Sequence, residues 1–188
     1  PKFSQKKNPA LFLEHRKNFS NGEVRTEFSG TIENQEVNEF KENKKRGHIK
    51  TVGSFDLSSN SYLDFNFHRT TDRNYLNTYK YNYKDTLESN IKIESLRSNN
   101  FYSFQSYLFQ DLRQQFDRKE TPKVLPRILI DLNSDSKNNS FSYNTNVEFS
   151  NIIRTNGNET KKLFFQQKFE FPKTFDDGTF FKPGVHLN

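Results

Sequence analysis

The chain has 188 residues, of which only 31% are hydrophobic, and its net charge is +6. So polar a chain is poorly suited to a two-layer globule, whose continuous core must offset the entropy of ordering the chain. Its 21 Phe and 8 Tyr equally argue against a disordered chain, which is usually poor in aromatic residues. The absence of cysteine excludes a disulfide framework and thiolate metal sites. The composition instead fits a fold that keeps large polar surfaces wet, as porin-type barrels do.

Strand patterns dominate the chain, with no convincing helix between them and no apolar run long enough for a transmembrane helix. Most candidates alternate apolar and polar residues, as in Leu63, Phe65 and Phe67 against their polar neighbours. Many are about 9–11 residues long, which is the length a tilted strand needs to cross a bilayer. The candidates span residues 10–19, 23–33, 48–58, 61–70, 86–97, 101–112, 124–133, 140–154, 162–172 and 179–188.

The links between these candidates alternate in length. Short turns rich in Asn, Asp, Ser and Gly alternate with longer polar links along most of the chain. This rhythm is typical of an up-and-down barrel, whereas a Greek-key sandwich has no reason to keep it. We therefore predict an all-β fold, an antiparallel up-and-down meander. The patterns alone leave open whether it is part of a large outer-membrane β-barrel or a soluble β protein. The short turns lie at 20–22, 58–60, 98–100 and 173–178, and the longer links at 34–47, 71–85 and 113–123.

The stretch "SFSYNTNVEF" at residues 140–149 shows the two faces most clearly. One face is apolar and the other polar, but alternation alone leaves open whether the apolar face contacts a protein core or lipid. In a barrel, the apolar face contacts lipid and the polar face lines a wet lumen. The predicted lipid-facing residues are Phe141, Tyr143, Val147, Phe149, Phe165, Phe169 and Phe171. The candidate lumen residues are Asn144, Asn146, Glu148, Gln166 and Lys168.

No catalytic or cofactor motif stands out. The four histidines, His15, His48, His68 and His186, are isolated in the sequence and are predicted to be solvated or strand-face residues. The chain has no phosphate-binding loop and no nucleophile motif, so we expect neither an enzyme nor a cofactor or metal. The stretch "TYKYNYKD" at 78–85 allows a stacking platform for single-stranded nucleic acid or an aromatic rim. We favour the rim and expect no nucleic-acid partner, since no basic patch accompanies the stretch.

Several ordered stretches together resemble the LptD family of LPS-assembly proteins, also called organic solvent tolerance protein (OstA), in its alphaproteobacterial form. Each stretch is short, but their order and spacing cover nearly the whole chain. The third resembles the family's Ser-Asp-x-x-Tyr-Leu-x-x-Tyr signature, with Thr71 where Ser is usual. The stretches are "NPALFLEHRKNFSNG" (8–22), "RGHIKTVGSFDL" (46–57), "TTDRNYLNTY" (70–79), "LESNIKIESLRSNNFYSFQSYLFQDLR" (87–113), "VLPRI" (124–128) and "FEFPKTFDDGTFFKPGVHL" (169–187).

Four residues within these motifs are expected to have structural roles. The Asp72 side chain is suited to capping a turn, and Tyr75 and Tyr79 are suited to anchoring the loop at a rim or against the lumen wall. Pro126 is expected at a strand end, where a missing N–H is tolerated. We therefore predict that all four fix the structure of loops and strand ends.

The resemblance implies an outer-membrane protein of a Gram-negative bacterium that assembles lipopolysaccharide into the outer leaflet. Its implied partners are lipopolysaccharide, outer-membrane lipid, a plug lipoprotein and the periplasmic Lpt bridge proteins. Residues 1–188 would be a partial C-terminal β-barrel domain, without the periplasmic jelly roll and the barrel's end. The start at Pro1 and the absence of Met agree with an internal fragment or a processed chain. The alternatives are another outer-membrane porin or receptor barrel, or a soluble glycan-binding β-sandwich.

Overall fold

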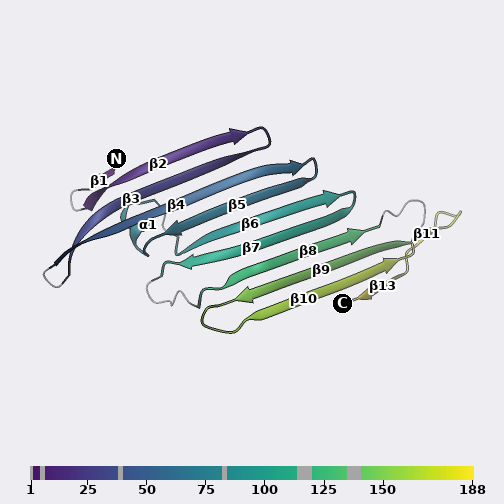
Figure 1. Ribbon diagram of the computed structural model, residues 1–188. Helices are drawn as coiled ribbons and strands as arrows, with labels where there is room; N and C mark the ends of the chain where they lie inside the picture. Colours follow the sequence, from purple (N-terminus) through teal and green to yellow (C-terminus); the bar gives the residue numbers. More distant parts are fainter. Residues whose placement is uncertain (1, 5–6, 38–39, 82–83, 114–119, 135–140) are drawn as a thin grey trace.

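The computed structural model describes residues 2–4, 7–37, 40–81, 84–113, 120–134 and 141–188, with side chains described from residue 8 onward except at 34–42. A single large antiparallel sheet contains most of the strands (Figure 1). Its strands are β1 (Lys2–Ser4), β2 (Lys7–Phe19), β3 (Gly22–Val37), β4 (Phe40–Ser58), β5 (Ser61–Thr70), β6 (Thr86–Arg97), β7 (Asn100–Asp111), β8 (Lys123–Asn133), β9 (Ser142–Ile153), β10 (Thr160–Glu170) and β13 (Gly184–Leu187).

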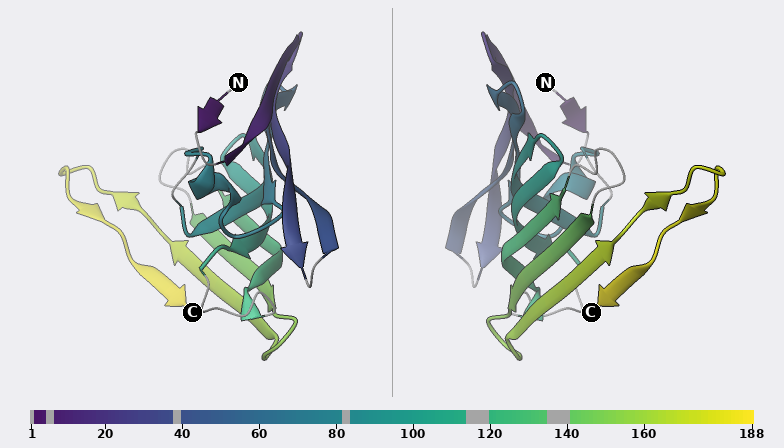
Figure 2. Two further views of the ribbon diagram at one scale, coloured as in Figure 1. Left: turned by 90° about the vertical axis from the view of Figure 1, so that its left-hand side faces the viewer. Right: turned by 90° about the vertical axis from the view of Figure 1, so that its right-hand side faces the viewer.

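The strands are ordered as in the sequence. Each strand from β1 to β10 pairs with its sequence neighbour, and β13 closes the series beside β10. A separate small hairpin, β11 (Lys173–Thr174) and β12 (Phe180–Phe181), extends away from the sheet near the C-terminus (Figure 2). The prediction of an all-β antiparallel meander is therefore confirmed. The same strand order contradicts the Greek-key sandwich, because the described strands neither cross over nor form two packed layers.

The register gives the sheet two chemically different faces. Because successive side chains of a strand point to opposite faces, residues aligned across the strands share a face. One such row is apolar and the adjacent row is polar, and the two rows are only one residue apart along each strand. The apolar row is Phe55, Leu63, Ile93, Phe104, Ile128, Phe149 and Leu163. The polar row is Ser54, Asp64, Lys92, Gln105, Arg127, Ser150 and Lys162. We refer below to the apolar face and the polar face on which these rows lie.

The predicted link at 34–47 is wrong. The ladder between β3 and β4 continues through this stretch to the pair Val37 and Phe40. These two strands run past the ends of their neighbours at the lower left of Figure 1. The prediction relied on the alternation of apolar and polar residues, which is present only where one face of a strand is apolar. The part of the β3–β4 hairpin that extends beyond the apolar face lacks this alternation, but its backbone pairing continues.

Two smaller differences involve proline. The predicted strand at 179–188 is divided into β12 and β13, with Pro183 between them. Pro126 lies inside β8, near its start, where the register with both β7 and β9 is irregular. A proline cannot donate to a ladder, so an irregular pairing site is where a sheet tolerates it.

Candidate functional site

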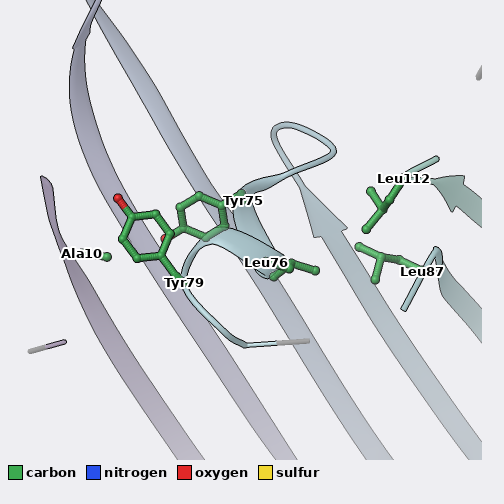
Figure 3. Close-up of a cluster of buried hydrophobic side chains, with 6 residues drawn as sticks. All are labelled: Ala10, Tyr75, Leu76, Tyr79, Leu87 and Leu112. Carbon is green, nitrogen blue, oxygen red and sulfur yellow. The ribbon is translucent and has the colours of Figure 1, made fainter. Parts of the chain in front are cut away.

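The segment after β5 folds back onto the polar face of the sheet. We call residues 71–81 the docked segment; it contains the short helix α1 (Tyr75–Thr78). Tyr75 and Leu76 are completely buried at 0% and 1% exposure, and they pack with Ala10, Leu87 and other apolar side chains (Figure 3). The Tyr75 hydroxyl lies 2.7 Å from Oγ of Ser29, a polar-face residue of β3. The predicted loop link at 71–85 thus contains an ordered element on the polar face.

An ion pair holds the start of the docked segment. The Arg46 guanidinium donates two hydrogen bonds to the Asp72 carboxylate, at 2.7 and 2.8 Å, and a third to Glu33 at 2.7 Å. Asp72 also accepts a hydrogen bond from the Asn74 backbone N–H at 3.0 Å, which is the turn-capping geometry. Burial opposes ionisation of Asp72, but the hydrogen bonds from Arg46 and Asn74 outweigh it and hold the pKa of Asp72 below its usual value. Asp72 therefore links the turn to strand β4.

Hydrogen bonds between Thr71 and the backbone of β4 complete this attachment. Thr71 and Gly47 exchange hydrogen bonds: the Thr71 N–H donates to the Gly47 carbonyl at 3.0 Å, and the Gly47 N–H donates to Thr71 Oγ1 at 3.0 Å. A Cβ at Gly47 would lie 2.5 Å from the Ser29 carbonyl oxygen, which is too close for any larger residue. Thr71 retains the hydroxyl that this contact uses, although the family signature usually has serine there.

The aromatic residues of the docked segment stack on each other and on the sheet. The rings of Tyr75 and Tyr79 are 4.9 Å apart, and Tyr81 lies 4.9 Å from His48 and 5.7 Å from Phe12. The Tyr79 hydroxyl donates to the Asn8 carbonyl at 2.9 Å. Burial raises the pKa of Tyr75, so its hydroxyl remains a neutral hydrogen-bonding group. These rings therefore pack against one another and against the sheet, with Tyr79 buried and Tyr81 half-buried.

Sequence reasoning missed the pairing of two histidines. His48 and His68 were expected to be isolated, yet their rings are 6.0 Å apart and both are buried. The β4–β5 register causes this, because it places His68 opposite Lys50, two residues from His48 on the same face. An irregularity between Asp56 and Ser58 shifts this register by one residue, so counting outward from the tight turn between β4 and β5 would have placed the two histidines on opposite faces. The described residues nevertheless contain no group of three or more His, Cys, Asp or Glu suited to hold a metal.

The five candidate lumen residues lie far along the sheet from the docked segment. Asn144 is opposite Lys168, and Asn146 is opposite Gln166, so the register places all of them on the polar face. Their contacts are polar: Asn144 donates to Asp131 at 2.8 Å, and Glu148 accepts from Arg127 at 2.9 Å. The separation into two faces is not complete. Phe164 lies on the polar face opposite Glu148, and Thr145 bonds Gln167 at 2.6 Å on the apolar face. That the polar face lines a lumen stays a prediction.

Comparison with known families gives a match to a single extended stretch of the chain. The family model LptD, described as "LPS transport system D", matches residues 44–188, which includes the docked segment and every strand from β5 onward. A search of curated proteins found no match. Among the residues that the structure describes, no helix is long and apolar enough to cross a membrane. The matched family transports lipopolysaccharide to the outer membrane of Gram-negative bacteria and is not a family of enzymes. Since the match covers well over half of the sequence, the chain belongs to the LptD family.

Proposed function

We propose that this chain forms part of the wall of an outer-membrane barrel that inserts lipopolysaccharide into the outer leaflet. In this proposal the apolar face contacts lipid, and the polar face lines the wet passage that the lipopolysaccharide sugars traverse. The observation that carries the proposal is the pair of adjacent rows, one apolar and one polar, that run without interruption from β4 to β10. A membrane barrel requires this arrangement on every strand.

The chemistry of the polar face suits a sugar-phosphate ligand. Sugar hydroxyls need many hydrogen-bonding partners, and phosphates need cations. Asn144, Asn146 and Gln166 supply amide groups, while Arg127 and Lys168 supply positive charge. These cations are paired with Glu148 and Glu170 at 2.9 and 2.8 Å, so the charges at these positions are balanced.

The described sheet is open at both edges, at β1 and at β13, so further strands are needed to close a barrel. We propose that residues 1–188 are part of a larger C-terminal barrel domain whose protein also has a periplasmic jelly roll. Family resemblance suggests the remaining partners, a plug lipoprotein inside the barrel and the periplasmic Lpt bridge proteins.

Site-specific photo-crosslinking in cells tests the proposed faces. Crosslinkers at Asn144 and Asn146 are expected to capture lipopolysaccharide, because both lie on the polar face. Crosslinkers at Tyr143 and Phe149, on the apolar face, are expected to capture bulk lipid and serve as matched controls. If the polar positions never capture lipopolysaccharide in an inserted and active protein, this face does not line its path.

A second candidate function, a different porin or receptor barrel, is also consistent with two-faced strands. The family match to residues 44–188 favours lipopolysaccharide assembly over it. Depletion of the protein separates the two. Loss of an LPS assembly protein leaves lipopolysaccharide on the periplasmic side, whereas loss of a porin leaves its surface display intact.

A further inference from the structure

Two facing glycines leave a groove on the apolar face of the sheet. Gly30 of β3 is opposite Gly47 of β4, and neither has a side chain to cover the ladder at this point. The neighbouring row on one side contains Phe28 and Ile49, and the row on the other side contains Ile32. Two adjoining hollows of about 410 and 570 Å³ lie here and share Phe28 and Gly30 in their lining. We call them together the glycine groove.

The two glycines differ in whether the backbone requires them. A Cβ at Gly47 would clash with the Ser29 carbonyl oxygen, as described above. A Cβ at Gly30 would lie 3.6 Å from the Arg46 carbonyl oxygen and 3.7 Å from the Phe28 ring, which are ordinary contact distances. The backbone at Gly30 is also outside the left-handed region. Gly30 therefore provides open space, and a glycine inside a strand often marks a place where another molecule approaches closely.

Two cations line the same groove. Arg69 lies on the apolar face opposite Ile49, and Lys45 lies there opposite Ile32. Both line the hollow of about 410 Å³. Among the residues that the structure describes, no carboxylate forms an ion pair with either cation. Arg69 donates one long hydrogen bond, to the His68 carbonyl at 3.3 Å, so most of its N–H donors remain for another acceptor.

This combination of groups indicates the type of ligand. A cation beside lipid-facing apolar side chains is costly unless it reaches an anion or water. A phosphate accepts the hydrogen bonds that a guanidinium and an ammonium donate. The floor between Phe28 and Ile32 is one row of side chains wide and has apolar walls, which suits a single hydrocarbon chain. A lipid that carries both a phosphate and acyl chains satisfies both parts of the groove.

We propose that the glycine groove binds one anionic phospholipid of the surrounding membrane, with an acyl chain over Gly30 and Gly47 and the phosphate on Arg69 and Lys45. The assignment rests on the proposed function, because it requires the apolar face to contact lipid. The two cations line one hollow and so provide for a single phosphate, as a phospholipid carries. They favour an anionic headgroup over a zwitterionic one, whose own positive charge they repel.

Native mass spectrometry of the whole protein in detergent measures this binding. The probes are phosphatidylglycerol, phosphatidylcholine with the same acyl chains, and lipid A. One phosphatidylglycerol should bind, and Arg69→Gln and Lys45→Gln should each weaken its binding by about tenfold, the effect of losing one charged hydrogen-bonding group. Lys44→Gln is the matched control, because Lys44 is adjacent in sequence but lies on the polar face opposite Glu33 and outside the groove. It should leave binding unchanged.

Filling the groove tests the position of the acyl chain. Gly30→Leu places a side chain on the floor without a backbone clash and should abolish one-to-one binding of phosphatidylglycerol. Val24→Leu is its control, because it adds bulk on the same face of β3 outside the groove. The Arg69 and Lys45 variants leave the floor unchanged, so they test the site even where Gly30→Leu does not fold.

The probes and controls decide between the alternatives. Equal binding of phosphatidylglycerol and phosphatidylcholine overturns the anion site, and tighter binding of lipid A than of phosphatidylglycerol overturns the choice of a phospholipid. Equal effects of Lys45→Gln and Lys44→Gln, or full binding by a folded Gly30→Leu variant, overturn the groove as the site.

The crosslinking experiment separates this inference from the proposed function. Capture of lipopolysaccharide at Asn144 with no effect of the Arg69 and Gly30 variants on probe binding would refute the lipid site and leave the function standing. Phosphatidylglycerol binding that depends on Arg69 and Gly30, without any capture of lipopolysaccharide at Asn144 or Asn146, would retain the lipid site and refute the function.

Discussion

The two halves of the sheet differ in how their polar face is covered. Every buried side chain in the described part of the chain lies between Ala10 and Leu112, and from residue 120 onward all side chains are at least partly exposed. In the first half, the docked segment covers the polar face and buries Ser29 and His48 beneath it. In the second half, no described segment covers β8, β9 and β10, and their polar side chains pair with one another, as Asn144 does with Asp131.

This difference separates two sources of stability. The docked segment provides a small local core, with aromatic packing and saturated hydrogen bonds, that belongs to the chain itself. The strands from β8 to β10 contribute mainly a backbone ladder and two exposed faces. In the proposed barrel, their apolar face gains stability only when lipid surrounds it. Substitutions in the first half should therefore act through packing, and those in the second half through the contrast between lipid and water.

The largest effect is expected from Tyr75→Ala. Truncating a fully buried aromatic side chain costs about 3–5 kcal/mol, and this change also removes the hydroxyl partner of Ser29. Tyr143→Ala is the matched control in the second half, because Tyr143 lies on the apolar face and is 41% exposed. Denaturant unfolding from lipid vesicles measures both free energies. Equal losses would show that the docked segment is not a local core.

The next largest effect tests the second half. Val147→Lys places a charge on the apolar face between Ile130 and Phe165, and is expected to cost about 2–4 kcal/mol near mid-membrane. Asn146→Lys changes the adjacent residue on the polar face and should be nearly neutral, because water remains available there. Folding into lipid vesicles compares the two variants. Similar costs would contradict the assignment of the faces.

Sequence reasoning predicted the meander well because period-two alternation is strong wherever a strand has one apolar face. The positions of Phe149 and Phe165 on one face, and of Asn146 and Gln166 on the other, follow directly from that alternation. It failed at 34–47, where residues beyond the apolar band form a regular ladder without an apolar pattern. Backbone hydrogen bonding is nearly independent of sequence, so composition alone could not identify those strand ends.

The docked segment was only partly predictable. Asp72 was expected to cap a turn and Tyr75 and Tyr79 to anchor a loop. In the structure Asp72 accepts a hydrogen bond from the Asn74 N–H, Tyr75 contacts Ser29 and Tyr79 donates to Asn8. Asn74 lies within the docked segment, whereas Ser29 and Asn8 lie on strands β3 and β2. The sequence could not identify these two partners. Such contacts depend on where the segment folds back, which is a tertiary property.

A smaller effect concerns the pH dependence of the docked segment. The pKa of Asp72 is lowered in the folded protein from its usual value of 3.8. The stabilisation is therefore complete above that usual value and is lost as the pH falls below it, through the lower folded pKa. Asp72→Asn should remove about 1.5 kcal/mol at neutral pH, the low end for hydrogen bonds to a charged group, because the Asp72 side chain is partly exposed.

Hydrogen exchange of the α1 backbone measures this effect. At neutral pH the Asp72→Asn variant should exchange about tenfold faster than the unmodified protein, which corresponds to the expected loss of free energy. As the pH falls below the usual carboxyl pKa and through the lower pKa of folded Asp72, the two proteins should converge, because protonation then removes the same charge. A constant difference at every pH would mean that the Asp72 charge does not hold the segment.

The smallest effect is expected from the ion pairs that the open polar face contains. Arg127 and Glu148 are 2.9 Å apart, but both side chains are about a third exposed, at 37% and 34%. A double-mutant cycle with Arg127→Gln and Glu148→Gln should give a coupling of about 0.2–1 kcal/mol that declines with added salt. The same cycle for Arg46 and Asp72, at 11% and 24% exposure and with two hydrogen bonds, should give a larger coupling that salt changes less. Two equal couplings with the same salt dependence would contradict the difference between the halves, because the covered pair would then be as well solvated as the open one.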